Sequence, residues 1–234
     1  MKTILIIPAF NEEKSIKKTV NSVLKSNYDY IVINDGSTDQ TKKILEANHY
    51  NHINLPVNLG IGGAVQTGYK YASLHNYDIA IQFDADGQHN IEYIDALIQP
   101  IIDKKANLII GSSFVDKTIK SQRSSKIRRL GIMFLSSTIK LLSGKRIYDP
   151  TSGFRAADQT IINLFANDYP LEYPEPISNY EIVRSKKYKV KEVPVKMNRR
   201  QAGCSSIHSW KSAYAAINVF LSILILTLGR NKYD

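Results

Sequence analysis

The sequence predicts an α/β fold in which a mainly parallel sheet is covered by helices on both faces. Short apolar runs alternate with stretches whose apolar residues recur at helical spacing, and this alternation favours parallel strands joined by helices. The apolar runs are continuous, as in strands buried on both faces. At 234 residues, with 43% hydrophobic and 22% charged content, the chain suits one folded domain with or without an appendage.

The first half of the chain shows this alternation most clearly. Residues 3–7 form an apolar strand that Pro8 ends, and Asn11 is a plausible N-cap for a helix with an apolar stripe from Ile16 to Leu24. Further strands are predicted at 30–33, 53–55, 79–83 and 108–110, and helices at 41–47, 64–74 and 91–102. Ligands of such folds bind at the carboxyl ends of the strands. Polar residues at these ends therefore predict a shared cleft, and they are Asn11, Asp35, Asn58 and Asp84.

The second half has a weaker pattern. A basic stretch at 117–129 precedes a predicted helix at 130–142, followed by a loop at 149–155 and a strand at 190–195. The last apolar run, 213–228, is shorter than the roughly 20 residues that span a bilayer, so it is either a core helix or an interfacial helix. Trp210 and Lys211 before it, with Arg230 and Lys232 after it, suit a membrane surface. We expect a catalytic domain at 1–206 and a C-terminal apolar helix, a candidate membrane-surface anchor, at 207–234.

The formal net charge of +10 suits an anionic membrane surface or a phosphorylated substrate. Nucleic acid is not expected as a partner, because the chain has neither a basic recognition helix nor an aromatic RNA-binding signature. The single cysteine, Cys204, excludes an intramolecular disulfide and fits a reducing compartment. The apolar run that ends at Pro8 is too short for an export signal.

Two carboxylates, Asp84 and Asp86, directly follow the strand predicted at 79–83. Neighbouring carboxylates repel each other unless a cation or several hydrogen-bond donors lie between them. Mg²⁺ or Mn²⁺, which takes oxygen ligands from protein and phosphate together, would resolve this repulsion. The alternative is that both acids are solvated turn residues.

The other polar loops allow two interpretations each. Asp35 begins a turn that either ends at a helix cap or contacts a base or ribose. The glycines at 60–63 serve close packing or ligand contact, and their spacing disfavours a nicotinamide site. The loop at 149–155 is a turn or a site that offers a carboxylate, hydroxyls and a guanidinium. Arg199 and Arg200 belong to a solvated turn or to a loop that closes over phosphate.

Taken together, these segments resemble glycosyltransferase family two, which has a GT-A type (Rossmann-like) nucleotide-binding domain. The resemblance is greater to its dolichyl- or polyprenyl-phosphate sugar synthase branch. That branch has three motifs matched here by Asp84, Asp86, Gln88 and His89, by Asp149, Ser152, Gly153, Phe154 and Arg155, and by Arg200, Gly203 and Ser205. Further motifs of the family are matched at residues 8–13, 35–39 and 58–60. Each motif is weak alone, but together they occur in the order typical of the family and cover nearly the whole chain.

The resemblance implies roles for individual residues. The donor would be bound by Pro8, Ala9, Asn11, Glu12, Asp35, Gly36, Asn58, Gly63, Asp84, Ala85, Asp86 and Arg200. The metal ion, Mg²⁺ or Mn²⁺, would be held by Asp84, Asp86 and Gln88. The acceptor phosphate would be bound by Arg128, Arg129, Ser152 and Arg155. The residues expected to carry catalysis are Asp86, Arg200 and Asp149.

The function implied is inverting transfer of one sugar from a UDP- or GDP-sugar to a polyprenyl phosphate at the cytoplasmic face of a membrane. The chain would attach peripherally or through a small membrane-protein subunit. A rival function is extension of a polysaccharide or lipid-linked glycan, which requires a general base, for which Asp149 is a candidate. A non-catalytic nucleotide-sugar-binding subunit is the third interpretation. The sequence identifies neither the sugar nor the nucleotide base.

Overall fold

A computed structural model describes residues 1–116, 126–198 and 209–229 of the chain. Within these residues seven strands form one sheet in the order β3-β2-β1-β4-β6-β5-β7. The strands are β1 (Thr3–Ala9), β2 (Asp29–Asn34), β3 (His52–Asn54), β4 (Ile79–Gln82), β5 (Leu108–Ser112), β6 (Arg155–Asp158) and β7 (Val190–Pro194). β6 runs antiparallel to both β4 and β5, whereas the other pairs are parallel. The predicted mainly parallel sheet is confirmed.

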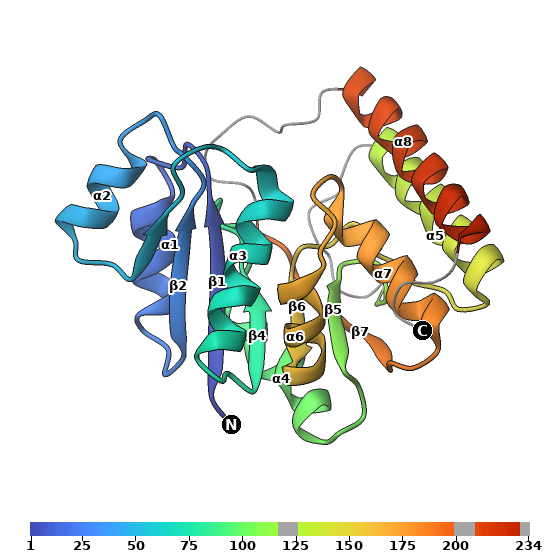
Figure 1. The fold of residues 1–234 in the computed structure, drawn as a ribbon, viewed down its shortest axis with the longest axis horizontal. Coiled ribbons are helices and arrows are strands. Elements are labelled where there is room, and N and C mark those ends of the chain that lie inside the picture. Colours follow the sequence, from blue (N-terminus) through green and yellow to red (C-terminus); the bar gives the residue numbers. More distant parts are fainter. Residues whose placement is uncertain (117–125, 199–208, 230–234) are drawn as a thin grey trace.

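Helices cover both faces of the sheet (Figure 1). They are α1 (Ile16–Val23), α2 (Thr41–Ala47), α3 (Gly60–Leu74), α4 (Ile94–Ile102), α5 (Lys126–Ser143), α6 (Gln159–Asn167), α7 (Pro174–Ser185) and α8 (Ser209–Leu228), with a short 3₁₀ helix at Ile91–Tyr93. Successive residues of β1 point to opposite faces, because side chains alternate along a strand. Ile4 and Ile6 therefore join the core under α3, α6 and α7, while Leu5 and Ile7 join the core under α1 and α4.

Several boundaries differ from the sequence prediction. β1 continues through Pro8 to Ala9, although the sequence analysis ended this strand at Pro8. α3 begins at Gly60, so the predicted glycine loop is its first turn, and a Cβ at Gly62 would lie 2.4 Å from the carbonyl oxygen of Leu171. Asn11 does not cap α1, because it has a φ of 55° and the helix begins only after Ser15. The loop predicted to extend to Arg155 ends one residue earlier, where β6 starts. The sequence pattern also missed β6, α6 and α7.

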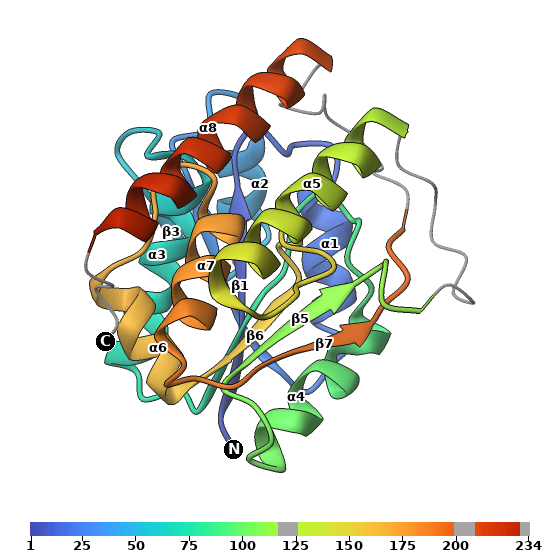
Figure 2. The same ribbon diagram turned by 90° about the vertical axis from the view of Figure 1, so that its right-hand side faces the viewer.

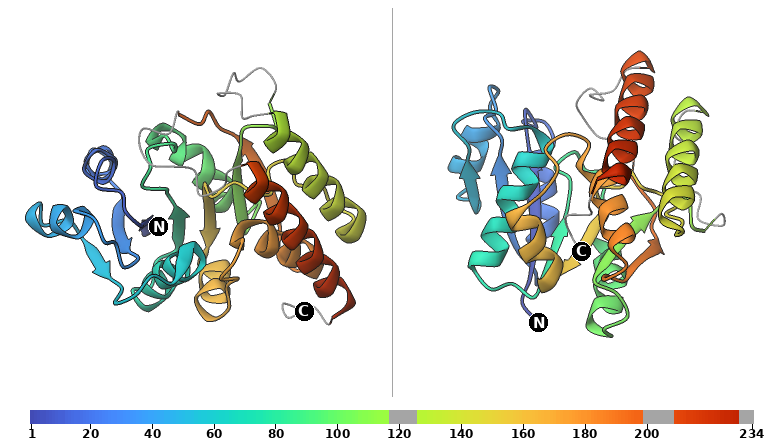
Figure 3. Two further views of the ribbon diagram at one scale, coloured as in Figure 1. Left: turned by 90° about the horizontal axis from the view of Figure 1, so that it is seen from above. Right: turned by 45° about the vertical axis from the view of Figure 1, so that its right-hand side comes forward.

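The C-terminal helix α8 lies beside α5 and α7 (Figures 2 and 3). One side of α8 is part of the core through Val219 and Ile223, and the Tyr180 hydroxyl is 2.7 Å from that of Thr227. Arg184 donates hydrogen bonds to the last carbonyls of the helix, including that of Thr227 at 3.1 Å. None of the described helices has the length and apolar character needed to cross a membrane. The predicted domain boundary at 206/207 lies outside the described residues and stays a prediction.

Candidate active site

Asp35 lies at the carboxyl end of β2, where the structure brings it next to the start of α3. Its side chain is buried, and its Oδ1 accepts a hydrogen bond from the Leu59 N–H at 2.7 Å. Burial raises the pKa of Asp35, while the N–H groups of Leu59 and Gly60 oppose this shift. Gly36 has a φ of 65°, and a Cβ there would lie 2.8 Å from the Asn58 nitrogen. Asp35, Gly36 and Asn58 therefore meet, and glycine is required for the approach.

The turn after β1 is tied to the turn after β2. The exposed Asn11 accepts a hydrogen bond on Oδ1 from the Thr38 N–H at 2.8 Å. The Glu12 N–H donates to the Thr41 hydroxyl at 2.8 Å, and the Glu12 carboxylate accepts from the Ser15 hydroxyl. Three further predicted donor-binding residues, Pro8, Ala9 and Gly63, are buried in the adjoining β1 and α3. The first two βα turns are thus joined by hydrogen bonds at the carboxyl ends of β1 and β2.

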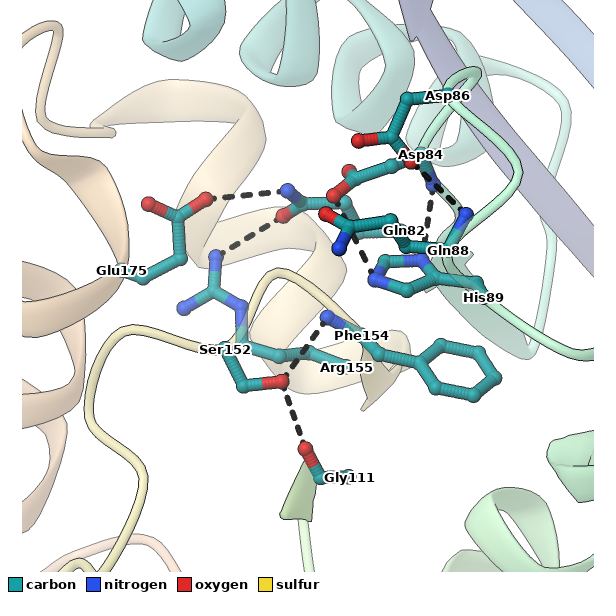
Figure 4. Close-up of polar contacts among 10 residues, drawn as sticks. All are labelled: Gln82, Asp84, Asp86, Gln88, His89, Gly111, Ser152, Phe154, Arg155 and Glu175. Atoms are coloured by element: carbon teal, nitrogen blue, oxygen red, sulfur yellow. Dashed lines mark hydrogen bonds and ion pairs between the residues drawn. The ribbon is translucent and has the colours of Figure 1, made fainter. Parts of the chain in front are cut away.

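The acidic pair follows β4 (Figure 4). Asp86 is only 3% exposed, and its Oδ1 accepts a hydrogen bond from the Gln88 N–H at 2.9 Å. Ala85, between the two acids, is buried, and its carbonyl accepts from the Thr19 hydroxyl at 2.8 Å. These two hydrogen bonds stabilise the turn that carries the acidic pair.

His89 orients Asp84 from within the same turn. Its Nδ1 accepts a hydrogen bond from the Asp84 N–H at 2.9 Å, so in the neutral ring Nε2 carries the hydrogen. That Nε2 lies 3.4 Å from Asp84 Oδ2. The ring stacks on Phe154, with centroids 4.5 Å apart and planes at 15°. His89 therefore connects the acidic pair to the loop before β6.

The electrostatics of the pair suit a bound cation. Burial raises the pKa of Asp84, and the negative charges of Asp86 and Glu175 raise it further, against the effects of His89 and Gln82. A third of the Asp84 side chain remains exposed, so its carboxylate is accessible. Both acids offer hard oxygen ligands, which fit Mg²⁺ or Mn²⁺. Within the described ranges, no three His, Cys, Asp or Glu side chains gather as a metal site, so such an ion would need further ligands, for example phosphate oxygens.

Gln88 and the arginine loop complete the predicted donor side. Gln88 is half-buried. Its N–H donates to Asp86, and its carbonyl oxygen accepts a hydrogen bond from the Asn198 N–H at 2.8 Å. Arg200, predicted to contact the donor phosphates, lies outside the described residues.

The loop at 149–154 lies directly against the acidic pair. A Cβ added to Gly153 would be 2.8 Å from Gln82 Nε2 and 3.3 Å from both carboxylate oxygens of Asp84. Only glycine allows this approach without displacement of its neighbours. The motifs predicted for donor and acceptor, 69 residues apart in the chain at Asp84 and Gly153, therefore form one site.

Asp149 is buried beside β5 and β7. Its Oδ2 lies 3.4 Å from both the N–H and the hydroxyl of Ser113, and its own N–H donates to Glu192 Oε1 at 2.8 Å. Burial raises the pKa of Asp149 to about 6; the Ser113 N–H and the positive charge of Arg128 oppose this, whereas Glu192 adds to it. Arg128, exposed at the start of α5 with Arg129, is therefore close enough to interact with Asp149.

Ser152 and Arg155 are placed differently from the predicted acceptor ligands. The Ser152 hydroxyl donates to the Gly111 carbonyl at 2.6 Å and is 6% exposed. Arg155 has no exposed surface. Its guanidinium donates to Ser178 Oγ at 2.9 Å, to Asn179 Oδ1 and Gln82 Oε1 at 3.3 Å each, and to the Tyr169 hydroxyl. Both side chains thus stabilise the loop and sheet from within, because backbone and core groups bind the Ser152 hydroxyl and both terminal nitrogens of the Arg155 guanidinium, whose buried Nε has no partner among the described residues.

Two polar residues at the site were missed by the sequence analysis. Gln82 interrupts the apolar strand β4, and this was the available signal. Glu175 lies in the first turn of α7, whose low amphipathicity hid the helix itself.

Comparisons with known proteins show which sequences this chain resembles. The model of the family described as "Glycosyl transferase family 2" matches residues 4–165. The UDP-N-acetylglucosamine–dolichyl-phosphate N-acetylglucosaminyltransferase of Methanococcus voltae is 34% identical, over 97% of this chain and 96% of that protein. The polyprenol monophosphomannose synthase of Mycolicibacterium smegmatis is 27% identical, over 88% and 81%.

A solved structure shares the fold. Glucosyl-3-phosphoglycerate synthase from Mycobacterium tuberculosis, crystallised with Mn²⁺, uridine diphosphate and glucosyl-3-phosphoglycerate, superposes with a TM-score of 0.70. The alignment covers 99% of this chain and 81% of that chain at 18% identity. At this identity the likeness shows a GT-A-like fold alone.

Proposed function

Because the chain belongs to glycosyl transferase family 2, and is therefore a glycosyltransferase, we propose that it transfers one sugar from a UDP- or GDP-sugar to a polyprenyl phosphate. The close approach of Gly153 to Asp84 carries this proposal, because it brings the donor and acceptor motifs together in one site. The similarity to a dolichyl-phosphate N-acetylglucosaminyltransferase and to a polyprenol monophosphomannose synthase supports it.

On the donor side, Asp84 and Asp86, with Gln88 beside them, would hold Mg²⁺ or Mn²⁺ on the donor diphosphate. When bound, the ion stabilises the negative charge of the departing nucleoside diphosphate. Asp35 and the tied turns after β1 and β2 would bind the nucleoside, since a carboxylate accepts hydrogen bonds from base or ribose. Arg200 is proposed to contact the phosphates on the strength of the resemblance.

On the acceptor side, the phosphate is already ionised at neutral pH and needs no general base. One phosphate oxygen attacks the anomeric carbon while the bond from that carbon to the diphosphate oxygen breaks, so the configuration inverts. Arg128 and Arg129, exposed near the start of α5, are the cations proposed to hold this phosphate. The work of the protein is then to position the two substrates.

A membrane surface is the proposed location of the lipid acceptor. α5 and α8 lie side by side and are joined by Phe134 and Phe220, whose ring centroids are 5.3 Å apart. Both helices expose large apolar side chains, namely Leu130, Met133, Phe134 and Leu141 on α5 and Ile217, Leu221, Ile225 and Leu228 on α8. Neither helix contains an acidic residue. An apolar face without negative charge, beside exposed arginines, suits an anionic lipid surface.

Glycan extension is the second candidate, and the raised pKa of Asp149 favours it. A buried carboxylate with a pKa of about 6 has the basicity of a general base for a sugar hydroxyl. The two functions are separated by supplying purified protein with a panel of UDP- and GDP-sugars, Mn²⁺, and either a prenyl phosphate or an oligosaccharide as the only acceptor. We expect a prenyl-phosphate sugar by mass spectrometry; product from the oligosaccharide alone would reject our proposal.

A further inference from the structure

Behind Asp84 lies a set of three polar side chains, Gln82, Arg155 and Glu175, which we call the polar bridge (Figure 4). Gln82 is 1% exposed at the end of β4. Its Nε2 donates to Glu175 Oε1 at 3.1 Å, and its Oε1 accepts from Arg155 at 3.3 Å. A Cβ on Gly153 would lie 2.8 Å from Gln82 Nε2 and 3.3 Å from both carboxylate oxygens of Asp84, so the amide lies close to Asp84. One amide is therefore bonded to a carboxylate and a guanidinium and lies close to a second carboxylate.

The chemistry of these groups determines how the amide is oriented. A guanidinium only donates hydrogen bonds and an ionised carboxylate only accepts them. The amide oxygen of Gln82 must therefore face Arg155, and its NH₂ group, which lies near Asp84, must face Glu175. Arg155 cannot turn away, because Ser178, Asn179 and Tyr169 also hold its guanidinium.

The polar bridge also joins separate parts of the fold at Asp84. Gln82 belongs to β4, Arg155 to the antiparallel strand β6, and Glu175 to the first turn of α7. Gly153 packs against Gln82 Nε2, so the loop before β6 adds to the same contact. The surroundings of the Asp84 carboxylate thus include residues up to 91 positions away in the chain.

We propose that Gln82 and Glu175 are positioning residues that hold the Asp84 carboxylate in the orientation required for the metal-bound donor. The inference rests on the proposed function, because this orientation matters only where Asp84 meets such a donor. Groups that hydrogen-bond a metal-ligating carboxylate typically change metal affinity by about 10- to 100-fold when they are removed. Glu175 acts through its acceptor oxygen on Gln82, and its charge is not required for this role.

The test is a titration of the whole chain with Mn²⁺, in the presence of UDP and separately of GDP, in which free Mn²⁺ is followed by electron paramagnetic resonance. We expect Gln82→Met, which keeps the length but removes the amide, to raise the Mn²⁺ Kd by about 10-fold or more. Glu175→Ala should raise it by about fivefold or more. Glu175→Gln keeps an acceptor oxygen, so its Kd should stay within about twofold of the wild type.

Gln66→Met is the matched control. Gln66 is a half-buried glutamine on α3 whose amide lies 3.5 Å from the Ala166 carbonyl, and its removal should leave the Kd unchanged. Thermal unfolding of every variant shows whether the fold is retained. If Gln82→Met does not fold, the two variants of the half-buried Glu175, Glu175→Ala and Glu175→Gln, still test the proposal.

Two results would overturn the inference alone: wild-type Kd values in Gln82→Met and Glu175→Ala, or equal losses in Glu175→Gln and Glu175→Ala, which would show that the charge matters. The proposed function fails differently. If the wild-type protein does not bind Mn²⁺ in the presence of either UDP or GDP, the proposed metal-bound donor is rejected. The positioning role of Gln82 and Glu175 is then rejected as well.

Discussion

The two sides of the cleft are built by different means. On the donor side, polar side chains are held by main-chain N–H groups of neighbouring turns, as Asp35 is by Leu59 and Asp86 by Gln88. On the acceptor side, the buried Arg155 is held by side chains, among them Ser178 of α7 and Gln82 of β4. The donor side is thus held by the backbone of the first half of the chain, whereas the surroundings of Arg155 form only after the second half has packed.

The outer surfaces differ as well. Around the donor side, α1 and α2 bury their apolar residues and expose lysines, including Lys17 and Lys42. Around the acceptor side, α5 and α8 expose leucine, isoleucine and phenylalanine. The spacing of apolar residues therefore has a different result in the two regions. In α1 it places the apolar residues in the core, whereas α8 has apolar residues on one side in the core and on another side exposed.

The largest effect is expected on the donor side from Asp86→Ala. Loss of a carboxylate from the metal site should lower kcat/KM for sugar transfer by about 10³-fold or more, since the ion provides several kcal/mol of charge stabilisation. Circular dichroism should show an unchanged fold, and the exposed Glu46→Ala is the control. Transfer at near wild-type rate by this variant, or by the wild type in chelator, would contradict the metal role.

Gly153→Ala should break the contact between the two sides. The added Cβ would displace Gln82 and Asp84, and we expect kcat/KM to fall by about 10- to 100-fold with about 1–3 kcal/mol of destabilisation. Gly131→Ala in α5 is the matched control, because a Cβ there meets nothing within 4 Å. This control should stabilise the helix by up to about 1 kcal/mol. Equal activity of the two variants would mean that the sides work independently.

Asp149 tests the acceptor side through pH. Its pKa of about 6 in the folded protein exceeds the ordinary value of 3.8, so the folded state binds the proton more tightly than the unfolded state. The free energy of unfolding should therefore rise as pH falls from 7 toward 4, by roughly 2–3 kcal/mol. Asp149→Asn should lack this rise in chemical denaturation.

The same variant separates the two candidate reactions. A phosphate acceptor needs no base, so Asp149→Asn should retain prenyl-phosphate transfer within about tenfold at pH 7. A loss of about 10²-fold or more, together with a wild-type rate that falls below pH 6, would assign Asp149 as a general base.

The smallest effect is expected on the apolar surface. Ile225→Ser on α8 should weaken binding to vesicles of anionic and neutral lipid by about three- to tenfold, because one partly exposed side chain contributes on the order of 1 kcal/mol. Leu74→Ser is the control, since Leu74 is 80% exposed at the end of α3, away from this surface. Equal vesicle sedimentation of both variants would remove α8 from the membrane contact and favour a protein partner.

The sequence by itself determined the strand–helix alternation and the residues at the strand ends. The helix predicted at 41–47 was found unchanged as α2, and the acidic pair follows β4 as expected. These features depend on local spacing and on turn chemistry, which neighbouring residues specify.

Only the tertiary structure decided the role of Arg155 and the existence of the polar bridge. From the sequence alone, an arginine after Phe154 is as compatible with a phosphate ligand as with a core residue. Burial of its charge became possible because β6 is inserted between β4 and β5 and because α7 supplies Ser178 and Asn179. A buried guanidinium requires such partners, and these come together only when distant segments pack.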